Sequence, residues 1–195
     1  MQGKVQGQSK GHFFLSLVFL VGLVGLFANP ARAADISVNR TSQGTTVVNV
    51  RGVISLADAV RFKRATAGLS HARVVFHSPG GHAVAGILIG RVIRSKGFST
   101  DVAASGRCAS ACALAWLGGS SRQMSGGRVG FHAAYGLQGG RAVRDAGANA
   151  RVTTYLRQLG LPSRAIAHIV QQSPQGMYWL TPGTARQAGI SLSSR

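Results

Sequence analysis

The chain has 195 residues, 45% of them hydrophobic, which is enough to bury a core and argues against disorder throughout the chain. Its charge is one-sided, because 22 lysines and arginines face only four acidic residues, for a formal net charge of +18. Since those four are the scattered aspartates Asp35, Asp58, Asp101 and Asp145, chemistry that needs a close carboxylate pair or an acidic calcium or magnesium cage is poorly supplied.

The first 33 residues have the three-part layout of a secretory signal peptide. A polar start with Lys4 and Lys10 precedes an apolar run, Phe13 to Ala28, and then Asn29-Pro30 and Ala31-Arg32-Ala33. We expect cleavage after Ala33 and export to the periplasm or beyond. The alternative is an inner-membrane anchor formed by Phe13–Ala28, but this run as a helix spans only about 24 Å of the roughly 30 Å hydrocarbon core. Cleavage removes three basic residues and no acid, so the mature chain stays strongly basic.

After the signal peptide we expect a short N-terminal segment, residues 34–44, and one domain, residues 45–195. Strand and helix patterns alternate along that domain. The predicted strands are Thr45–Ser55, Arg73–His77, Phe98–Ala104 and Gly127–His132. The predicted helices are Leu56–Leu69, Ala83–Ser95, Ala109–Leu117, Ala142–Leu159, Ser163–Gln171 and Pro182–Ala188. This alternation indicates an α/β fold with mainly parallel strands, in which Gly136–Gly140 is a long flexible loop.

Three turns at strand ends are the candidates for chemistry, because ligands of α/β folds bind where strands lead into helices. The first is Ser78-Pro79-Gly80-Gly81, whose glycines let backbone N–H groups approach a ligand closely. The second is the small-residue turn Gly106–Ala113, which places Ser110 near a helix start. The third is Gly130-Phe131-His132. Taken singly, each has an ordinary structural explanation: a tight turn, an N-cap serine and a core histidine.

The two cysteines, Cys108 and Cys112, lie on either side of Ser110. In an exported chain they can form a disulfide, or they can simply pack together. A zinc site would need two further ligands, and the six histidines show no second pair at ligand spacing, so we expect no metal and no cofactor. At about 100° per residue on a helix, Ser110 projects about 200° from both Cys108 and Cys112, which argues against a cysteine nucleophile.

In this order, the Ser-Pro-Gly-Gly strand end, the serine turn and the strand ending in histidine resemble the Clp protease proteolytic subunit and its crotonase-like superfamily. The resemblance covers about residues 45–190 and is strongest to exported, periplasmic members with a Cys-x-Ser-x-Cys turn. It implies a spiral of repeated ββα units and a serine hydrolase, a peptidase acting on peptides or proteins, often as a homo-oligomer. It also implies the site residues: Ser110 as nucleophile, His132 as general base, and the N–H groups of Gly81 and Ala111 as the oxyanion hole, with Gly80 in the same turn.

The chain departs from the family pattern at the third catalytic residue. The family's aspartate falls just before the final aromatic segment, where this chain has Met177. Ala133-Ala134 stands where Gln-Pro usually follows the histidine, and Cys108 where alanine is usual. No carboxylate follows Asp145. Four interpretations stay open: Asp145 reaches His132, a backbone carbonyl orients the ring, a Ser–His dyad operates, or the site is inactive.

Two other functions compete with the hydrolase. One is a non-catalytic protein of the same fold that binds a peptide or acyl ligand beside Gly80-Gly81. The other is a basic protein that binds anions or an anionic envelope surface. The basic residues that would serve it are Arg91, Arg94, Arg141, Arg144, Arg151 and Arg157. They are dispersed, and no aromatic residues alternate with them for stacking on bases, so we expect no specific nucleic-acid partner.

Overall fold

The structure is a computed structural model that describes residue 3, residues 33–173 and residues 175–193. The predicted signal peptide and the alternative anchor Phe13–Ala28 lie outside the described residues, apart from Gly3 and Ala33. Within the described ranges, no helix combines the length and the apolar character needed to cross a membrane. Residues 33–173 and 175–193 belong to one compact unit, and the following description concerns that unit.

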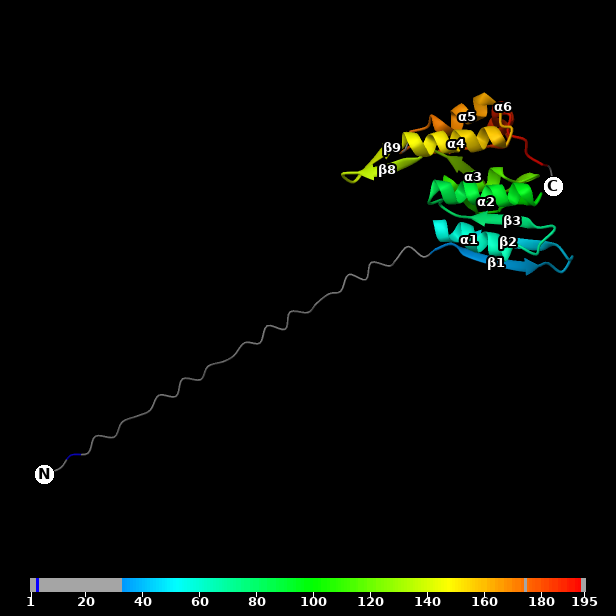
Figure 1. Cartoon of the computed structure of the whole chain (residues 1–195), viewed down its shortest axis with the longest axis horizontal. Helices are drawn as coiled ribbons and strands as arrows, with labels where there is room; N and C mark the ends of the chain where they lie inside the picture. Colours follow the sequence, from blue (N-terminus) through cyan, green and yellow to red (C-terminus); the bar gives the residue numbers. More distant parts are fainter. Residues whose placement is uncertain (1–2, 4–32, 174, 194–195) are drawn as a thin grey trace. The chain divides into compact units, whose positions relative to one another are not determined.

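The main sheet has five strands in the order β1-β2-β3-β4-β6 (Figure 1). The strands are β1 (Asp35–Arg40), β2 (Thr46–Arg51), β3 (Arg73–His77), β4 (Ser99–Ala103) and β6 (Arg122–Ser125). All neighbours are parallel except β1 and β2, which are antiparallel. Alternate apolar side chains of the central strands, such as Val50 and Phe76, are almost fully buried, as a half-buried strand requires. β1, which the sequence did not predict, therefore joins residues 34–44 to the domain through β2.

A second sheet lies beside the main one and contains β5 (Arg107–Ala109), β7 (Arg128–Phe131) and β10 (Tyr178–Trp179), in the order β10-β7-β5. Parallel bridges from Ile54 to Gly81 and from Ser78 to Cys108 extend it. β2, β3 and β4 are thus each followed by a short stretch in the second sheet and then by a helix, and β6 is followed by β7, the hairpin β8–β9 and α4. This repeat, with mainly parallel strands, confirms the predicted α/β spiral of ββα units.

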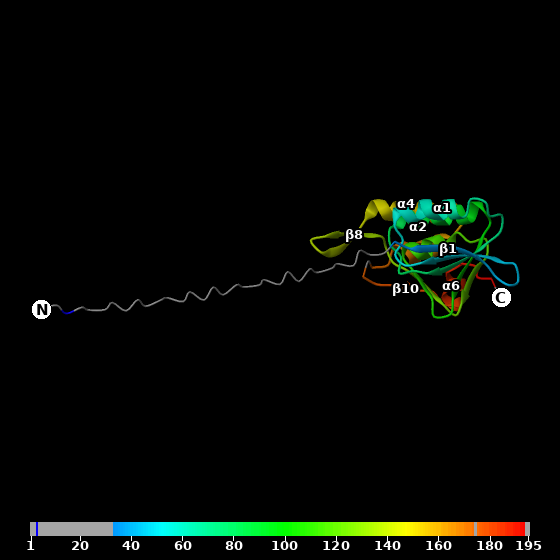
Figure 2. The same ribbon diagram turned by 90° about the horizontal axis from the view of Figure 1, so that it is seen from below.

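Six helices accompany the sheets. They are α1 (Leu56–Ala65), α2 (Ala83–Ser95), α3 (Ala111–Leu117), α4 (Ala146–Gln158), α5 (Ser163–Val170) and α6 (Pro182–Ala188). Figure 2 shows α1, α2 and α4 on one side of the strands and α6 on the other. All seven residues of α3 are buried, so this helix lies in the core and its first turn has a fixed position.

The predicted helix start at Ala109 is wrong. Residues 107–109 form β5, which pairs in parallel with β7, and α3 begins only at Ala111. Cys108 is therefore in a strand and not on the helix, so the argument from helical projection angles does not apply to it. Three residues are too few for a period-2 pattern to reveal the strand.

Residues 135–144 also differ from the prediction. They form a hairpin of β8 (Tyr135–Gln138) and β9 (Arg141–Arg144), where we expected a flexible loop followed by a helix from Ala142. The hairpin projects from the domain beside α4 (Figure 1). Its side chains are mostly exposed, so they carry no hydrophobic periodicity, and α4 begins after it at Ala146.

Candidate active site

Ser110 stands at the sharp turn between β5 and α3. Its backbone angles are φ 55° and ψ −122°, a conformation that is strained for a residue with a Cβ. The turn is held by a hydrogen bond from the Ser110 N–H to the Gly130 carbonyl, 2.9 Å long. The half-buried hydroxyl neither caps α3 nor makes another hydrogen bond among the described residues. A strained strand-to-helix turn is a typical position for a nucleophilic serine, because it presents the hydroxyl to a ligand.

A disulfide joins Cys108 to Cys112 across this turn, with the two Cα atoms 5.1 Å apart. Cys108 lies in β5 and Cys112 in the first turn of α3, and both are fully buried. The sequence alone allowed either a disulfide or simple packing of the two cysteines, and the structure contains the disulfide. Because the chain has two cysteines and both are bonded, the oxidised protein has no thiol nucleophile.

The glycine turn lies directly against the serine turn. Gly80 and Gly81 have φ angles of 103° and 144°, which favour glycine. A Cβ on Gly80 would stand 2.8 Å from the Cβ of Ser110, and one on Gly81 only 2.1 Å from the Ile54 carbonyl oxygen. Both positions therefore need glycine for the close approach as well as for the φ angle.

Two backbone donors at this junction are available for a ligand. The N–H groups of Gly81 and Ala111 donate to no acceptor within the part of the chain that the structure describes. A Cβ on Gly80 would lie 3.2 Å from the Ala111 nitrogen, so the glycine turn adjoins the start of α3. Unpaired N–H groups beside a serine hydroxyl are what an oxyanion hole requires.

His132 follows β7 directly, and its half-buried ring lies 5.4 Å from the Tyr135 ring, centroid to centroid. Its Nδ1 is 2.7 Å from the backbone oxygen of Ala133. Since a carbonyl oxygen only accepts hydrogen bonds, this contact places a hydrogen on Nδ1. In the neutral ring, Nε2 then carries the free lone pair and can accept a proton.

One cavity of about 490 Å³ brings the predicted residues together, since Gly81, Ser110, His132 and Asp145 all line it. The parallel pairing of β5 and β7 explains part of this arrangement. Ala109 is opposite Gly130, so the residues that follow the two strands emerge at the same edge of the second sheet.

Asp145 lines the cavity but serves as the N-cap of α4. Its Oδ1 accepts a 2.8 Å hydrogen bond from the Ala148 N–H, and the residue is exposed. No hydrogen bond or ion pair links it to His132 in the described parts of the chain. The acceptor at His132 Nδ1 is instead the Ala133 carbonyl, which corresponds to the second of the four interpretations.

Met177 is the residue at which the family resemblance predicts a carboxylate. β10 pairs with β7 in antiparallel fashion, with Tyr178 opposite Phe131. Continuing this register by one residue brings Met177 opposite His132. Met177 is half-buried, and its thioether is at best a weak hydrogen-bond acceptor.

Tyr155, which the sequence analysis did not single out, fixes one wall of the cavity. Its hydroxyl donates a 3.1 Å hydrogen bond to the Leu114 carbonyl and so ties α4 to α3. Burial raises the pKa of this phenol, so it stays neutral and keeps its hydrogen for the bond. Leu114 and Val152, from these two helices, both line the cavity.

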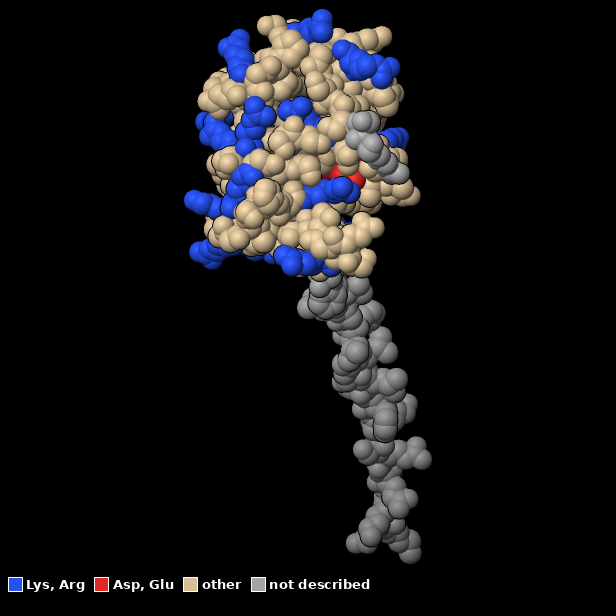
Figure 3. Space-filling view, turned by 90° about the vertical axis from the view of Figure 1, so that its right-hand side faces the viewer, with Lys and Arg blue, Asp and Glu red and all other residues tan. Residues whose placement is uncertain are grey.

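On the face that Figure 3 shows, the lysines and arginines are not gathered in one patch but lie at several separate places among other residues. Arg151, in α4, is the basic residue among those that line the cavity.

Comparison with known proteins identifies the fold. No family model and no curated protein matches the chain. A mutant of the 1510-N membrane-bound stomatin-specific protease is similar in structure, with a TM-score of 0.57 and 18% identity over 73% of this chain and 74% of its own. A second mutant of that protease, in complex with a substrate peptide, gives a TM-score of 0.56 and 18% identity over 73% and 70%. ClpP1 from Listeria monocytogenes gives a TM-score of 0.54 and 19% identity over 74% and 87%. The chain therefore has the Clp protease-like fold, as predicted.

Proposed function

We propose that the protein is an exported serine peptidase in which Ser110 is the nucleophile and His132 the general base. The observation that carries this proposal is the backbone of Ser110, a strained turn at the cavity whose hydroxyl makes no hydrogen bond with any described residue. Strained backbone of this kind clusters at active sites and ligand-binding turns. The N–H groups of Gly81 and Ala111 beside it, which donate to no described residue, support the same conclusion.

In the proposed reaction, Nε2 of His132 takes the proton from Ser110 Oγ as the oxygen attacks the acyl carbon of a peptide bond. The N–H groups of Gly81 and Ala111 stabilise the oxyanion of the tetrahedral intermediate. The protonated His132 then donates its proton to the leaving amine, and an acyl-enzyme on Ser110 remains. Water, deprotonated by the same ring, hydrolyses this ester and restores the serine.

The Ala133 carbonyl takes the orienting role in this scheme, because it accepts the hydrogen bond from His132 Nδ1. A neutral carbonyl stabilises the imidazolium ion less than a carboxylate does. Loss of the carboxylate in a Ser-His-Asp triad lowers kcat by about 10⁴. We therefore expect slow turnover but ready formation of a covalent adduct with a reactive probe.

A peptide substrate is favoured by the structural neighbours, one of which is described in complex with a substrate peptide. Export is favoured by the disulfide, because such bonds persist in oxidising compartments. We also expect a homo-oligomer, since the hairpin β8–β9 exposes apolar side chains, with Leu137 71% exposed. Light scattering of the purified mature protein measures its oligomeric state directly.

The proposal is tested with a fluorophosphonate probe and intact-mass measurement. The wild-type mature protein gains the mass of one probe, Ser110→Ala gains none, and the control Ser42→Ala, which alters an exposed serine, reacts like wild type. A wild type that stays unlabelled, or a Ser110→Ala variant that is labelled equally, overturns the assignment.

A second candidate, a peptide-binding protein without catalysis, is favoured by Met177 at the carboxylate position. In that case wild type and Ser110→Ala bind a fluorescent peptide library with the same affinities. Cleavage of any bound peptide by wild type excludes it.

A further inference from the structure

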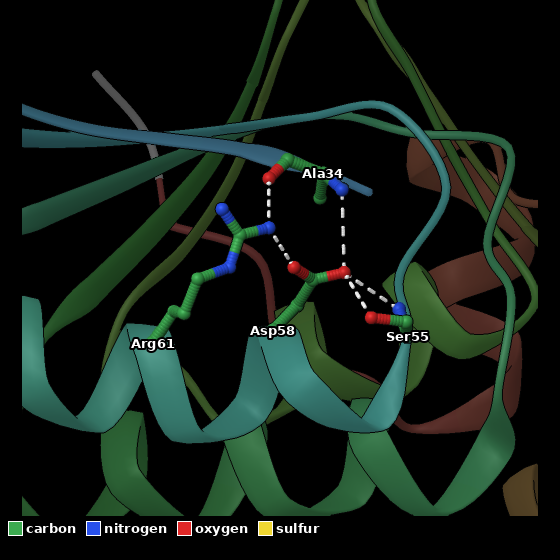
Figure 4. Close-up of polar contacts among 4 residues, drawn as sticks. All are labelled: Ala34, Ser55, Asp58 and Arg61. Carbon is green, nitrogen blue, oxygen red and sulfur yellow. Dashed lines mark hydrogen bonds and ion pairs between the residues drawn. The ribbon is translucent and has the colours of Figure 1, made fainter. Parts of the chain in front are cut away.

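Asp58 is a fully buried carboxylate that collects hydrogen bonds from three residues (Figure 4). Its Oδ2 accepts from the Ser55 N–H at 2.7 Å, from the Ser55 hydroxyl at 2.8 Å and from the Ala34 nitrogen at 3.2 Å. Its Oδ1 pairs with Arg61, which also donates a 2.7 Å hydrogen bond to the Ala34 carbonyl. Ala34 is therefore held by both its backbone nitrogen and its backbone oxygen.

The carboxylate is charged at neutral pH. Burial raises the pKa of Asp58, but the hydrogen bonds from Ser55, Arg61 and Ala34 outweigh it and leave the pKa below its ordinary value. Its ion-pair partner Arg61 has a half-exposed side chain, so water already solvates part of that cation. Asp58 can therefore accept a second positive charge.

Ala34 is the residue that cleavage after Ala33 would turn into the first residue of the mature chain. Ala34 is fully buried, whereas Ala33 is exposed and forms an isolated parallel bridge with Val53. Cleavage replaces the Ala34 peptide N–H by an α-amino group, whose ordinary pKa of about 7.7–8.0 makes it mostly an ammonium ion at pH 7. The nitrogen that gains this charge is already within hydrogen-bond distance of Asp58.

We propose that Asp58 is a binding site for the α-amino group of Ala34, formed when the signal peptide is removed, and that the resulting ion pair helps to hold the oxyanion turn, residues Gly80 to His82, whose Gly81 N–H is a proposed oxyanion donor. The first part rests on the proposed export, and the second also on the proposed active site. The peptide N–H already donates to an ionised carboxylate. Cleavage adds a positive charge on the donor, so that a hydrogen bond with one charged partner becomes an ion pair with two.

A short path leads from Asp58 to the oxyanion turn. Asp58 fixes the backbone of Ser55, and the neighbouring Ile54 is bonded to the turn on both sides. The Ile54 N–H donates to the Gly80 carbonyl at 2.8 Å, and the Ile54 carbonyl accepts from the His82 N–H at 2.8 Å. Gly81, between these two residues, packs directly against Ile54. Ala34 and Asp58 are thus positioning residues for the Gly81 N–H.

The first test measures the pKa of the amino group. The full-length chain is expressed and exported, its N-terminus is determined by mass spectrometry, and the ¹³Cα signal of Ala34 is titrated by NMR. We expect an N-terminus at Ala34 and an α-amino pKa at least one unit above the ordinary range, because a nearby carboxylate favours the ammonium form. A different N-terminus, or an unshifted pKa, overturns the proposal.

Variants show which carboxylate raises the pKa of the Ala34 α-amino group. The other charged groups near Ala34 in sequence or register are Asp35, Arg51 and Arg61. Asp58→Asn abolishes the shift, whereas Asp35→Asn, a matched control one residue from the amino group, retains it. If Asp58→Asn does not accumulate, the wild-type titration still decides the outcome.

The second test asks whether the ion pair reaches the active site. Ala33→Leu removes the small residue that signal cleavage requires and so keeps the Ala34 nitrogen in a peptide bond. We expect the fluorophosphonate probe to label Ser110 at least ten-fold more slowly in this unprocessed chain than in the mature protein. Equal rates refute the coupling to the oxyanion turn. If no form of the protein is labelled, the proposed function fails, while the amino-group pKa still decides whether Asp58 binds the mature N-terminus.

Discussion

Replacing Ser110 by glycine is expected to stabilise the protein while it removes the nucleophile. The Ser110 backbone has φ 55° and ψ −122°, and a strained conformation of this kind costs about 1–3 kcal/mol. Glycine adopts it freely but loses about 0.5–1 kcal/mol more conformational entropy on folding. The net gain is about 1 kcal/mol, which for a chain of this length raises Tm by about 2–4 °C.

Ser110→Ala distinguishes the effect of the missing hydroxyl from the effect of backbone strain. Alanine keeps the Cβ and therefore the backbone strain. The substitution removes only a hydroxyl that makes no cap hydrogen bond in the wild type. We expect its free energy of unfolding to stay within about 0.5 kcal/mol of wild type, as for a side chain without a structural role. Both variants lose labelling by the fluorophosphonate probe.

Thermal and urea unfolding followed by circular dichroism, with the disulfide intact, measure these differences. Ser105→Gly is the matched control, because Ser105 is the other described non-glycine residue with a positive φ, 62°, and it does not line the cavity. This variant should also be stabilised but should keep full labelling. A Ser110→Ala variant that loses more than about 1 kcal/mol, together with a Ser110→Gly variant that gains nothing, would refute the strain argument.

Three further predictions concern the surroundings of the serine. Gly81→Ala places a Cβ 2.1 Å from the Ile54 oxygen, so it should cost about 1–3 kcal/mol in urea unfolding and abolish probe labelling; a stable, reactive variant would contradict the assigned turn. Met177→Asp supplies a carboxylate opposite His132 and should raise the acylation rate at least ten-fold in stopped-flow assays; an unchanged rate would contradict the placement of residue 177 beside His132. The pKa of Asp58 is lower in the folded protein than in the unfolded chain, where it is about 3.9. The ionised carboxylate therefore stabilises the fold fully above about pH 3.9, and this stabilisation is lost as the pH falls through the folded pKa. Asp58→Asn should therefore lower the urea midpoint at pH 7 more than at pH 3, and equal losses at both would contradict this assignment.

The site was predictable where local signals are strong. Two adjacent glycines at a strand end, and a serine among small residues, indicate sharp turns whatever the rest of the chain does. His132 ends an apolar strand that a simple pattern reveals. The alternation of these strands with helices then indicates parallel strands, and parallel strands bring such turns to one edge.

The remaining features depend on contacts between distant segments. The three residues of β5 pair with β7, and the exposed hairpin β8–β9 has no buried face, so neither leaves a periodic pattern. In the sequence, Asp58 looks like an ordinary residue of a helix. Its contact with Ala34, 24 residues earlier in the chain, is visible only in the folded structure. The sequence also left Asp145 as a candidate third member, because only the structure places it as the cap of α4.

A crystal structure of the mature protein after reaction with the fluorophosphonate tests the central claim most directly. The account predicts a phosphorus–oxygen bond to Ser110 Oγ, with the phosphoryl oxygen about 2.7–3.1 Å from the Gly81 and Ala111 nitrogens. It also predicts Nε2 of His132 on the side of the leaving group. A probe bonded to another residue, or a phosphoryl oxygen that faces away from both N–H groups, would contradict it.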